Sequence, residues 1–196
     1  MSCGTKEKRL PYIGHHDIAR VASDHYDMGD TIYHTIPSFE YLTQDSTLLN
    51  AEDIKGKVWI AKFFFTTCPT ICPPMTSAMK EVHEGLSDEI ENLVFLSFTI
   101  DPEKDTPSKL AEYVSVHGIT SKNWYFLTGE ESETHDLGVN GFYVHAMSDD
   151  LAPGGFAHSP NFVLVDQHGH IRGLYDGLME EDRAQLVEDV RFLIKN

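Results

Sequence analysis

The pattern of hydrophobic and polar residues becomes regular from Pro37 onward. Residues 38–43 alternate between apolar and polar side chains, which predicts a half-buried strand. Later runs are short and apolar nearly throughout, as expected of central strands that are buried on both faces. These runs are Val58–Phe65, Leu93–Ile100 and Trp124–Gly129. The sequence therefore predicts a sheet whose centre lies inside the protein.

Helices are predicted between and after these strands. Apolar residues recur every three or four positions in Pro73–Leu86, and the two prolines that open this segment are tolerated in the first turn of a helix. Thr106 is a suitable N-cap for a second helix, which ends at Gly118. A short helix over Glu130–Leu137 and a closing helix over Glu180–Ile194 complete the set.

The order of the elements indicates the fold class. Strand, helix, strand, helix and strand are followed by a hairpin over Asn161–Gly177 and the closing helix. This order is typical of an α/β protein with a thioredoxin-like sandwich, in which helices flank a central mixed sheet, here with an added hairpin. Residues 3–30 are polar and show no sustained period. We therefore expect an N-terminal arm over residues 1–36 and one thioredoxin-like domain over residues 37–196.

Two cysteines occupy the reactive position of this fold. Cys68 and Cys72 lie between the end of a central strand and the start of a helix, where unpaired N–H groups and the helix dipole favour a thiolate. The spacing is one residue longer than the Cys-x-x-Cys of thioredoxin-type enzymes. The pair alone fits a catalytic disulfide, part of a metal site or a structural bridge. A structural bridge is the weakest of these, because so short a loop constrains little chain entropy.

Composition and charge exclude some classes of function. Lys and Arg number 15 against 31 Asp and Glu, which gives a net charge of −16. We do not expect nucleic-acid binding, because so acidic a chain without a basic stripe repels phosphate backbones. No stretch approaches the roughly 18 apolar residues that cross a bilayer.

The start of the chain, Met1–Thr5, resembles that of a mature bacterial lipoprotein whose Cys3 carries the lipid. An exposed cysteine near a natural N-terminus is the alternative. We expect the lipidated form, which would be tethered by Cys3 on the periplasmic side of a bacterial membrane. Disulfides can persist in that compartment.

Four segments in a fixed order carry a more specific resemblance. They are FFFTTCPTICPPM, FLSFTIDPEKDTPSKLAEYV, WYFLTG and HSPNFVLVDQHGHIRGLYDG. Together they resemble the Sco/SenC family of copper-binding thioredoxin-like proteins, which help to assemble cytochrome c oxidase. The resemblance extends from about Pro37 to the C-terminus.

This resemblance implies that the metal ligands are Cys68, Cys72 and His158. The cysteines are one helical turn apart, so both sulfurs can reach one ion. Thiolates are soft ligands that select Cu(I), and an imidazole suits both Cu(I) and Cu(II). Zinc could use the same three groups, so the choice of a copper ion rests on the resemblance as well as on the ligand types. His158 precedes the predicted strand Asn161–Asp166, which in this fold runs beside the cysteine loop.

The leading hypothesis is a copper metallochaperone rather than an enzyme. It would bind the copper-bearing subunit of cytochrome c oxidase and deliver copper to the CuA site, and the form with a Cys68–Cys72 disulfide would bind copper poorly. The alternative is a thiol-disulfide oxidoreductase in which these cysteines are the redox-active pair. Such an enzyme would keep the cysteines of the oxidase reduced, with a thioredoxin-like protein as its reductant. A peroxidase-like enzyme has weaker support, because we find no recognised peroxidatic motif.

Other side chains can bind metal but have ordinary explanations. His15 and His16 could hold copper loosely in the arm, whereas we expect them to be solvated, like His145 and Met147. The segment Asp101–Pro107 follows a strand and is expected to form the turn that starts the next helix.

Pro160 lies where thioredoxin-fold reductases place a cis-proline that faces the active cysteines. We therefore expect the Ser159–Pro160 peptide bond to be cis.

Overall fold

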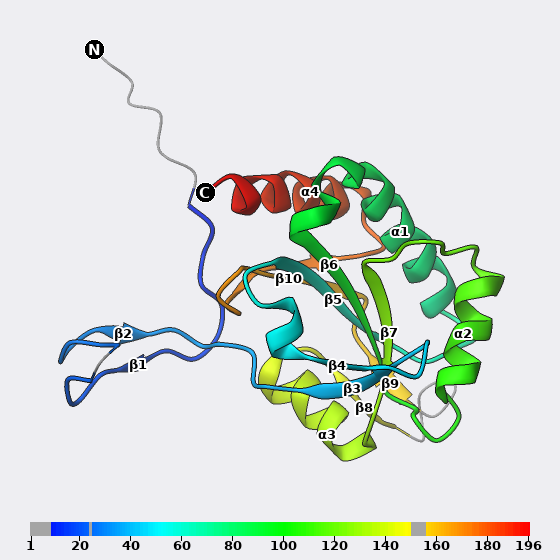
Figure 1. The fold of residues 1–196 in the computed structure, drawn as a ribbon, viewed down its shortest axis with the longest axis horizontal. Helices are drawn as coiled ribbons and strands as arrows, with labels where there is room; N and C mark the ends of the chain where they lie inside the picture. Colours follow the sequence, from blue (N-terminus) through cyan, green and yellow to red (C-terminus); the bar gives the residue numbers. More distant parts are fainter. Residues whose placement is uncertain (1–8, 24, 150–155) are drawn as a thin grey trace, which may run out of the picture.

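A mixed sheet forms the centre of the protein (Figure 1). The computed structural model describes residues 9–23, 25–149 and 156–196. Over these residues seven strands form the main sheet in the order β11-β10-β5-β6-β7-β3-β4. Their bounds are β3 (Glu40–Thr43), β4 (Leu48–Asn50), β5 (Val58–Phe64), β6 (Leu93–Thr99), β7 (Trp124–Thr128), β10 (Asn161–Val165) and β11 (Ile171–Asp176). Strands β5, β6 and β7 are parallel, and the pairings outside them are antiparallel. The predicted thioredoxin-like sandwich is confirmed.

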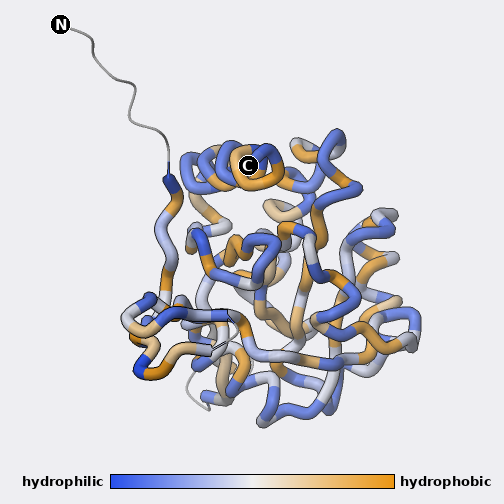
Figure 2. Tube along the Cα trace, turned by 60° about the vertical axis from the view of Figure 1, so that its left-hand side comes forward, coloured by the Kyte–Doolittle hydropathy of each residue, from blue (hydrophilic) through white to orange (hydrophobic). Residues whose placement is uncertain are grey.

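The central strands are buried on both faces because successive side chains point in opposite directions. Every residue of β5 and β6 is buried. Phe63 stacks on Phe98 on one face, while Phe64 packs edge-to-face on Phe126 on the other. Figure 2 shows the corresponding concentration of hydrophobic residues in the interior and the alternation of polar and apolar residues along the closing helix.

Four α-helices cover the sheet in the described part of the chain. They are α1 (Cys72–Gly85), α2 (Pro107–Val116), α3 (Glu131–Asp136) and α4 (Glu180–Lys195). Short 3-10 helices span Ala51–Ile54 and Ser87–Asn92. Thr106 caps α2 as predicted, because its hydroxyl accepts a hydrogen bond from the Lys109 N–H. Helix α3 is shorter than predicted, because the chain widens into a π-helical turn over Leu137–Gly141.

Two small hairpins were not predicted. One lies in the arm and pairs β1 (Asp17–Ile18) with β2 (Thr31–Ile32). The other pairs β8 (Ala146–Ser148) with β9 (Phe156–His158). It packs closely on the π-helical turn, since a Cβ atom on Gly138 would come within 2.5 Å of the Ala146 Cβ. This second hairpin fixes the position of β9, the strand that precedes β10.

The expectation of a cis Ser159–Pro160 bond is wrong, because no cis peptide bond occurs among the described residues. The chain runs directly from β9 into β10 and needs no tight turn at this point. The Ser159 N–H donates to the His145 carbonyl at 3.1 Å, and the Pro160 carbonyl accepts from the Gly177 N–H at 2.9 Å. Both bonds continue the pairing of the two neighbouring hairpins.

The described part of the arm is anchored to the edge of the sheet. Ile13 forms an isolated antiparallel bridge with Ile171 of β11. The Arg172 guanidinium donates to the Pro11 and Leu10 carbonyls and lies 4.1 Å from the Tyr12 ring. The arm therefore shields the outer strand at this point, while the β1–β2 hairpin projects away from the domain (Figure 1). In the described residues, no helix has both the length and the apolar character of a membrane span.

Candidate metal centre

The cysteine loop connects the end of β5 to the start of α1. The Cys68 N–H donates to the Phe65 carbonyl at 3.3 Å, which turns the chain directly after the strand. Cys72 is the first residue of α1, and prolines occupy the next two positions, where no N–H group is required. Both cysteines carry thiols in this structure, and only 6% of the surface of Cys68 and 1% of that of Cys72 is exposed. Of the three predicted ligands, the structure therefore brings Cys68 and Cys72 together in one buried loop.

The two thiols are electrostatically different. Burial opposes ionisation of Cys68, but hydrogen bonds from the Thr70 and Cys72 backbone N–H groups outweigh it, so the pKa of Cys68 lies below its usual value. Burial is also the largest influence on Cys72, and it raises the pKa of that thiol well above its usual range. The Cys72 thiol also interacts directly with the Cys68 sulfur. Cys68 is therefore the more readily ionised thiol of the pair, which favours it over Cys72 as a nucleophile.

Asp105 fixes the start of the cysteine loop. Its buried carboxylate accepts hydrogen bonds from the Thr66 N–H at 2.9 Å, from the Thr66 hydroxyl, and from the Thr99 hydroxyl at 2.5 Å. Thr66 is two residues before Cys68, so this carboxylate ties the loop to the end of β6. The segment Asp101–Pro107 does form the expected turn, but the sequence did not reveal that Asp105 also positions the loop.

The backbone of β9 approaches the same region. The Phe156 ring lies 5.2 Å from the ring of Phe65, the residue that leads into the cysteine loop. His158 is the last residue of β9, where it pairs with Ala146. It lies three residues before the start of β10, which is antiparallel to β5. The side chain of His158 lies outside the part of the chain that the structure describes. Its role as a ligand therefore stays a prediction.

Other metal-capable residues lie elsewhere or have other contacts. The His15 ring contacts the ring of Tyr143 in the domain, and the His16 ring contacts the ring of Tyr33 in the arm. His145 is exposed, as is Met147 of β8. Among the described side chains, no three His, Cys, Asp or Glu residues form a metal-binding group. A candidate site in these residues therefore consists of the two thiols alone.

One further histidine borders this region and was not singled out from the sequence. His135 of α3 hydrogen-bonds the Ile100 carbonyl at 3.0 Å and meets the Phe156 ring edge-on at 6.2 Å. Because its ring already hydrogen-bonds Ile100, the residue directly after β6, we assign His135 a structural role beside β9.

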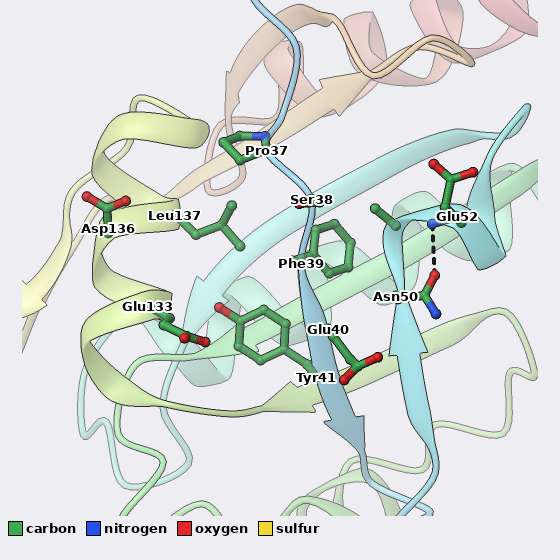
Figure 3. A pocket seen from close by; sticks show the side chains of 11 residues that line it. Pro37, Ser38, Phe39, Glu40, Tyr41, Asn50, Glu52, Glu133, Asp136 and Leu137 are labelled. Carbon is green, nitrogen blue, oxygen red and sulfur yellow. Dashed lines mark hydrogen bonds between the residues drawn. The ribbon is translucent and has the colours of Figure 1, made fainter.

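A large cleft lies away from the cysteines. It has a volume of about 850 Å³ and is bordered by α3, β3 and the 3-10 helix after β4. Figure 3 shows Tyr41 and Phe39 inside it, with carboxylates from both walls. Its acidic residues are Glu40, Glu52, Glu133 and Asp136, and neither cysteine nor histidine lines it. Such oxygen ligands suit hard cations, so this cleft is not a candidate site for a soft metal.

Comparison with known proteins places these features in one family. The SCO1/SenC family model matches residues 29–195. A relative from Stutzerimonas stutzeri, described as a putative copper-binding protein, is 30% identical over 154 residues, which are 78% of this chain and 74% of the relative.

Two solved structures share both the fold and part of the sequence. The crystal structure of a SCO1/SenC family lipoprotein from Bacillus anthracis has a TM-score of 0.75 and 30% identity, over 82% of this chain and 95% of the other. BsSco, described as a member of the Sco family of cytochrome c oxidase assembly proteins with a disulfide switch, has a TM-score of 0.73 and 30% identity. That match covers 82% of this chain and 94% of BsSco.

Proposed function

Because the chain belongs to the SCO1/SenC family, we propose that it is a copper metallochaperone that takes part in the assembly of cytochrome c oxidase. The observation that carries this proposal is the pair of buried thiols in the loop between β5 and α1, where the Cys72 thiol interacts directly with the Cys68 sulfur. Two thiolates at this spacing can bind one soft ion. The copper-binding description of the Stutzerimonas relative supports the same cargo.

In this proposal one copper ion is held by Cys68, Cys72 and His158. Cu(I) displaces the thiol protons and binds both sulfurs, while the imidazole supplies a third ligand that also suits Cu(II). The packing of Phe156 of β9 on Phe65, the residue that leads into the cysteine loop, supports His158 as that third ligand. Formation of a Cys68–Cys72 disulfide would remove both thiolates and release the metal.

The recipient in this proposal is the copper-bearing subunit of cytochrome c oxidase, at its CuA site. Transfer would proceed by exchange of ligands, with thiolates of the recipient replacing those of Cys68 and Cys72. We also propose that the protein works outside the cytoplasm, anchored by a lipid on Cys3. The Bacillus anthracis neighbour, a lipoprotein, supports this location, and radiolabelled fatty acid incorporated by the full-length precursor but not by a Cys3→Ser variant would test it.

Anaerobic titration of the reduced protein with Cu(I) tests the metal site. We expect tight one-to-one binding by the wild type, loss of binding in a Cys68→Ser/Cys72→Ser variant and weaker binding in His158→Ala. His145→Ala is the matched control, since His145 is an exposed histidine just before β8, and it should bind like the wild type. Equal weakening by both histidine variants, or binding that survives loss of the cysteines, would contradict the proposed ligand set.

A thiol-disulfide oxidoreductase is the second candidate. A pKa that is lowered at Cys68 and raised at Cys72 is an arrangement suited to attack on a disulfide, and BsSco is described as having a disulfide switch. His158→Ala separates the two functions, because disulfide exchange does not need the imidazole. Rapid exchange with a thioredoxin-like protein together with negligible copper binding would favour the reductase.

A further inference from the structure

A lysine is buried in the centre of the sheet. Lys62 lies on β5 in the apolar run that leads to the cysteine loop, and none of its surface is exposed. Its Nζ donates to the Thr76 hydroxyl at 2.7 Å, and the Thr76 hydroxyl lies 2.8 Å from the Tyr113 hydroxyl. The rings of Phe64 and Trp124 lie 5.4 and 5.8 Å from the same nitrogen.

These partners place the ammonium group beneath Cys72. Thr76 follows Cys72 by four residues on α1, so the two side chains lie on one face of the helix, one turn apart. The charges of Lys62 and Cys72 influence each other: the lysine lowers the pKa of the thiol, and the thiolate raises the pKa of the lysine. Lys62 therefore acts on Cys72 through space, without a direct hydrogen bond to it in the contacts described here.

Stability does not explain a lysine in this position. Burial lowers the pKa of Lys62 to about 7, which shows how unfavourable the site is for a charge. An apolar side chain of similar volume would fill the space without that penalty. Within the described part of the chain, no carboxylate forms an ion pair with Lys62, and its hydrogen-bond and ring partners are neutral. The negative charge that it can balance is therefore the one on the cysteine sulfurs.

That charge depends on the bound metal. Two thiolates and a neutral imidazole give a net charge of −1 with Cu(I) and of zero with a divalent ion such as Zn(II). The positive charge of protonated Lys62 stabilises the first complex and gives no such gain to the second, and the thiolate of Cys72 in turn raises the pKa of the lysine. The ligands alone do not make this distinction, since zinc accepts the same three groups.

We propose that Lys62 is a specificity-determining residue that raises the preference of this site for Cu(I) over Zn(II). The inference rests on the proposed function, because it takes Cys68, Cys72 and His158 as the ligands. In the binding step both thiol protons leave to solvent, two sulfur–copper bonds form, and no electron is transferred. The ammonium group stays beneath Cys72 and offsets the remaining negative charge.

The test compares two metal affinities in the same variants. Reduced wild type, Lys62→Met, Lys62→Gln and Lys62→Arg are titrated anaerobically with Cu(I) and, separately, with Zn(II), each against a chromophoric chelator. Lys62→Gln keeps a donor for Thr76 without the charge, and Lys62→Arg keeps the charge. Lys122→Met is the matched control, because it removes one exposed positive charge elsewhere. Circular dichroism and thermal unfolding establish that each variant is folded.

We expect the ratio of Cu(I) to Zn(II) affinity to fall by about tenfold or more in both neutral variants. Lys62→Arg should restore it, and Lys122→Met should leave it unchanged. An unchanged ratio, or equal losses of both metals, would show that Lys62 acts only on structure and would overturn the inference while leaving the proposed function intact. Absence of Cu(I) binding by the wild type would instead refute the proposed function, and the inference with it.

Discussion

The hydrogen bonds of Asp105 give a quantitative prediction about the cysteine loop. Replacement of Asp105 by Ala removes the acceptor of three hydrogen bonds that come from Thr66 and Thr99. The two hydroxyl groups can rotate toward other acceptors, but the Thr66 N–H is fixed by the backbone. Since Asp105 is fully buried, water does not simply replace the lost partner.

The magnitude follows from these contacts. A hydrogen bond to a charged group contributes about 1.5–3 kcal/mol, so the three together contribute at most several kcal/mol to the free energy of unfolding. Burial of the carboxylate offsets part of this gain, as the raised pKa of Asp105 indicates. We therefore expect Asp105→Ala to lower the free energy of unfolding by about 3 kcal/mol. Asp105→Asn keeps one oxygen for the Thr66 N–H and should lose only about 1 kcal/mol.

Urea unfolding of the reduced, metal-free protein measures these values, and the rate at which Ellman's reagent modifies Cys68 reports the position of the loop. Asp105→Ala should react several-fold faster than the wild type, since the loop is no longer tied to β6, and Asp105→Asn should lie between the two. A loss of less than about 1 kcal/mol in Asp105→Ala, with an unchanged rate of modification, would refute the assigned role.

Three further predictions test other parts of the structure. Iodoacetamide should alkylate Cys68 well before Cys72 near neutral pH, so Cys68→Ser should slow the initial rate far more than Cys72→Ser; equal effects would contradict the assigned difference in pKa. Between pH 7 and 8.5 the unfolded state should bind more protons at Lys62 than the folded state, because burial lowers the pKa of this lysine to about 7. The unfolding free energy of the wild type should therefore rise relative to that of Lys62→Met by up to about 1.4 kcal/mol per pH unit, and parallel curves in urea titrations would disprove this. Arg172→Ala should release the arm and accelerate its proteolysis, because Arg172 donates to the Pro11 and Leu10 carbonyls. It should also lower the free energy of unfolding by about 2–3 kcal/mol, because the buried Asp166 loses its ion pair, and Arg172→Lys should retain part of this stability.

The strands and helices of the domain could be predicted because their signals are local. The apolar runs of β5 and β6 reflect burial on both faces, and Thr106 marks the start of α2 by a cap that involves residues only three apart. The hairpins β1–β2 and β8–β9 could not be predicted, because strands of two or three residues are too short to show a period.

The residues of the candidate site also differ in whether the sequence could predict their roles. Cys68 and Cys72 could be placed from the sequence, because strand and helix boundaries fix their position. Asp105 could not be assigned to the loop, because its contact with Thr66 joins residues 39 positions apart. Lys62 did leave a signal, a charged residue inside an otherwise apolar central strand, but only the structure shows that Thr76 of α1 is its partner. The expectation of a cis bond before Pro160 was wrong. It rested on the position that a cis-proline takes in thioredoxin-fold reductases, and that position alone does not determine whether the backbone turns there.

X-ray absorption at the copper edge tests the central claim most directly. The measurement uses the anaerobic one-to-one Cu(I) complexes of the wild type and of His158→Ala, at a protein concentration where the complex is monomeric. We predict two sulfur ligands and one imidazole nitrogen in the wild type, and loss of the imidazole contribution in the variant with both sulfurs retained. Copper surrounded only by nitrogen and oxygen, or an imidazole contribution that persists without His158, would contradict the proposed site of Cys68, Cys72 and His158.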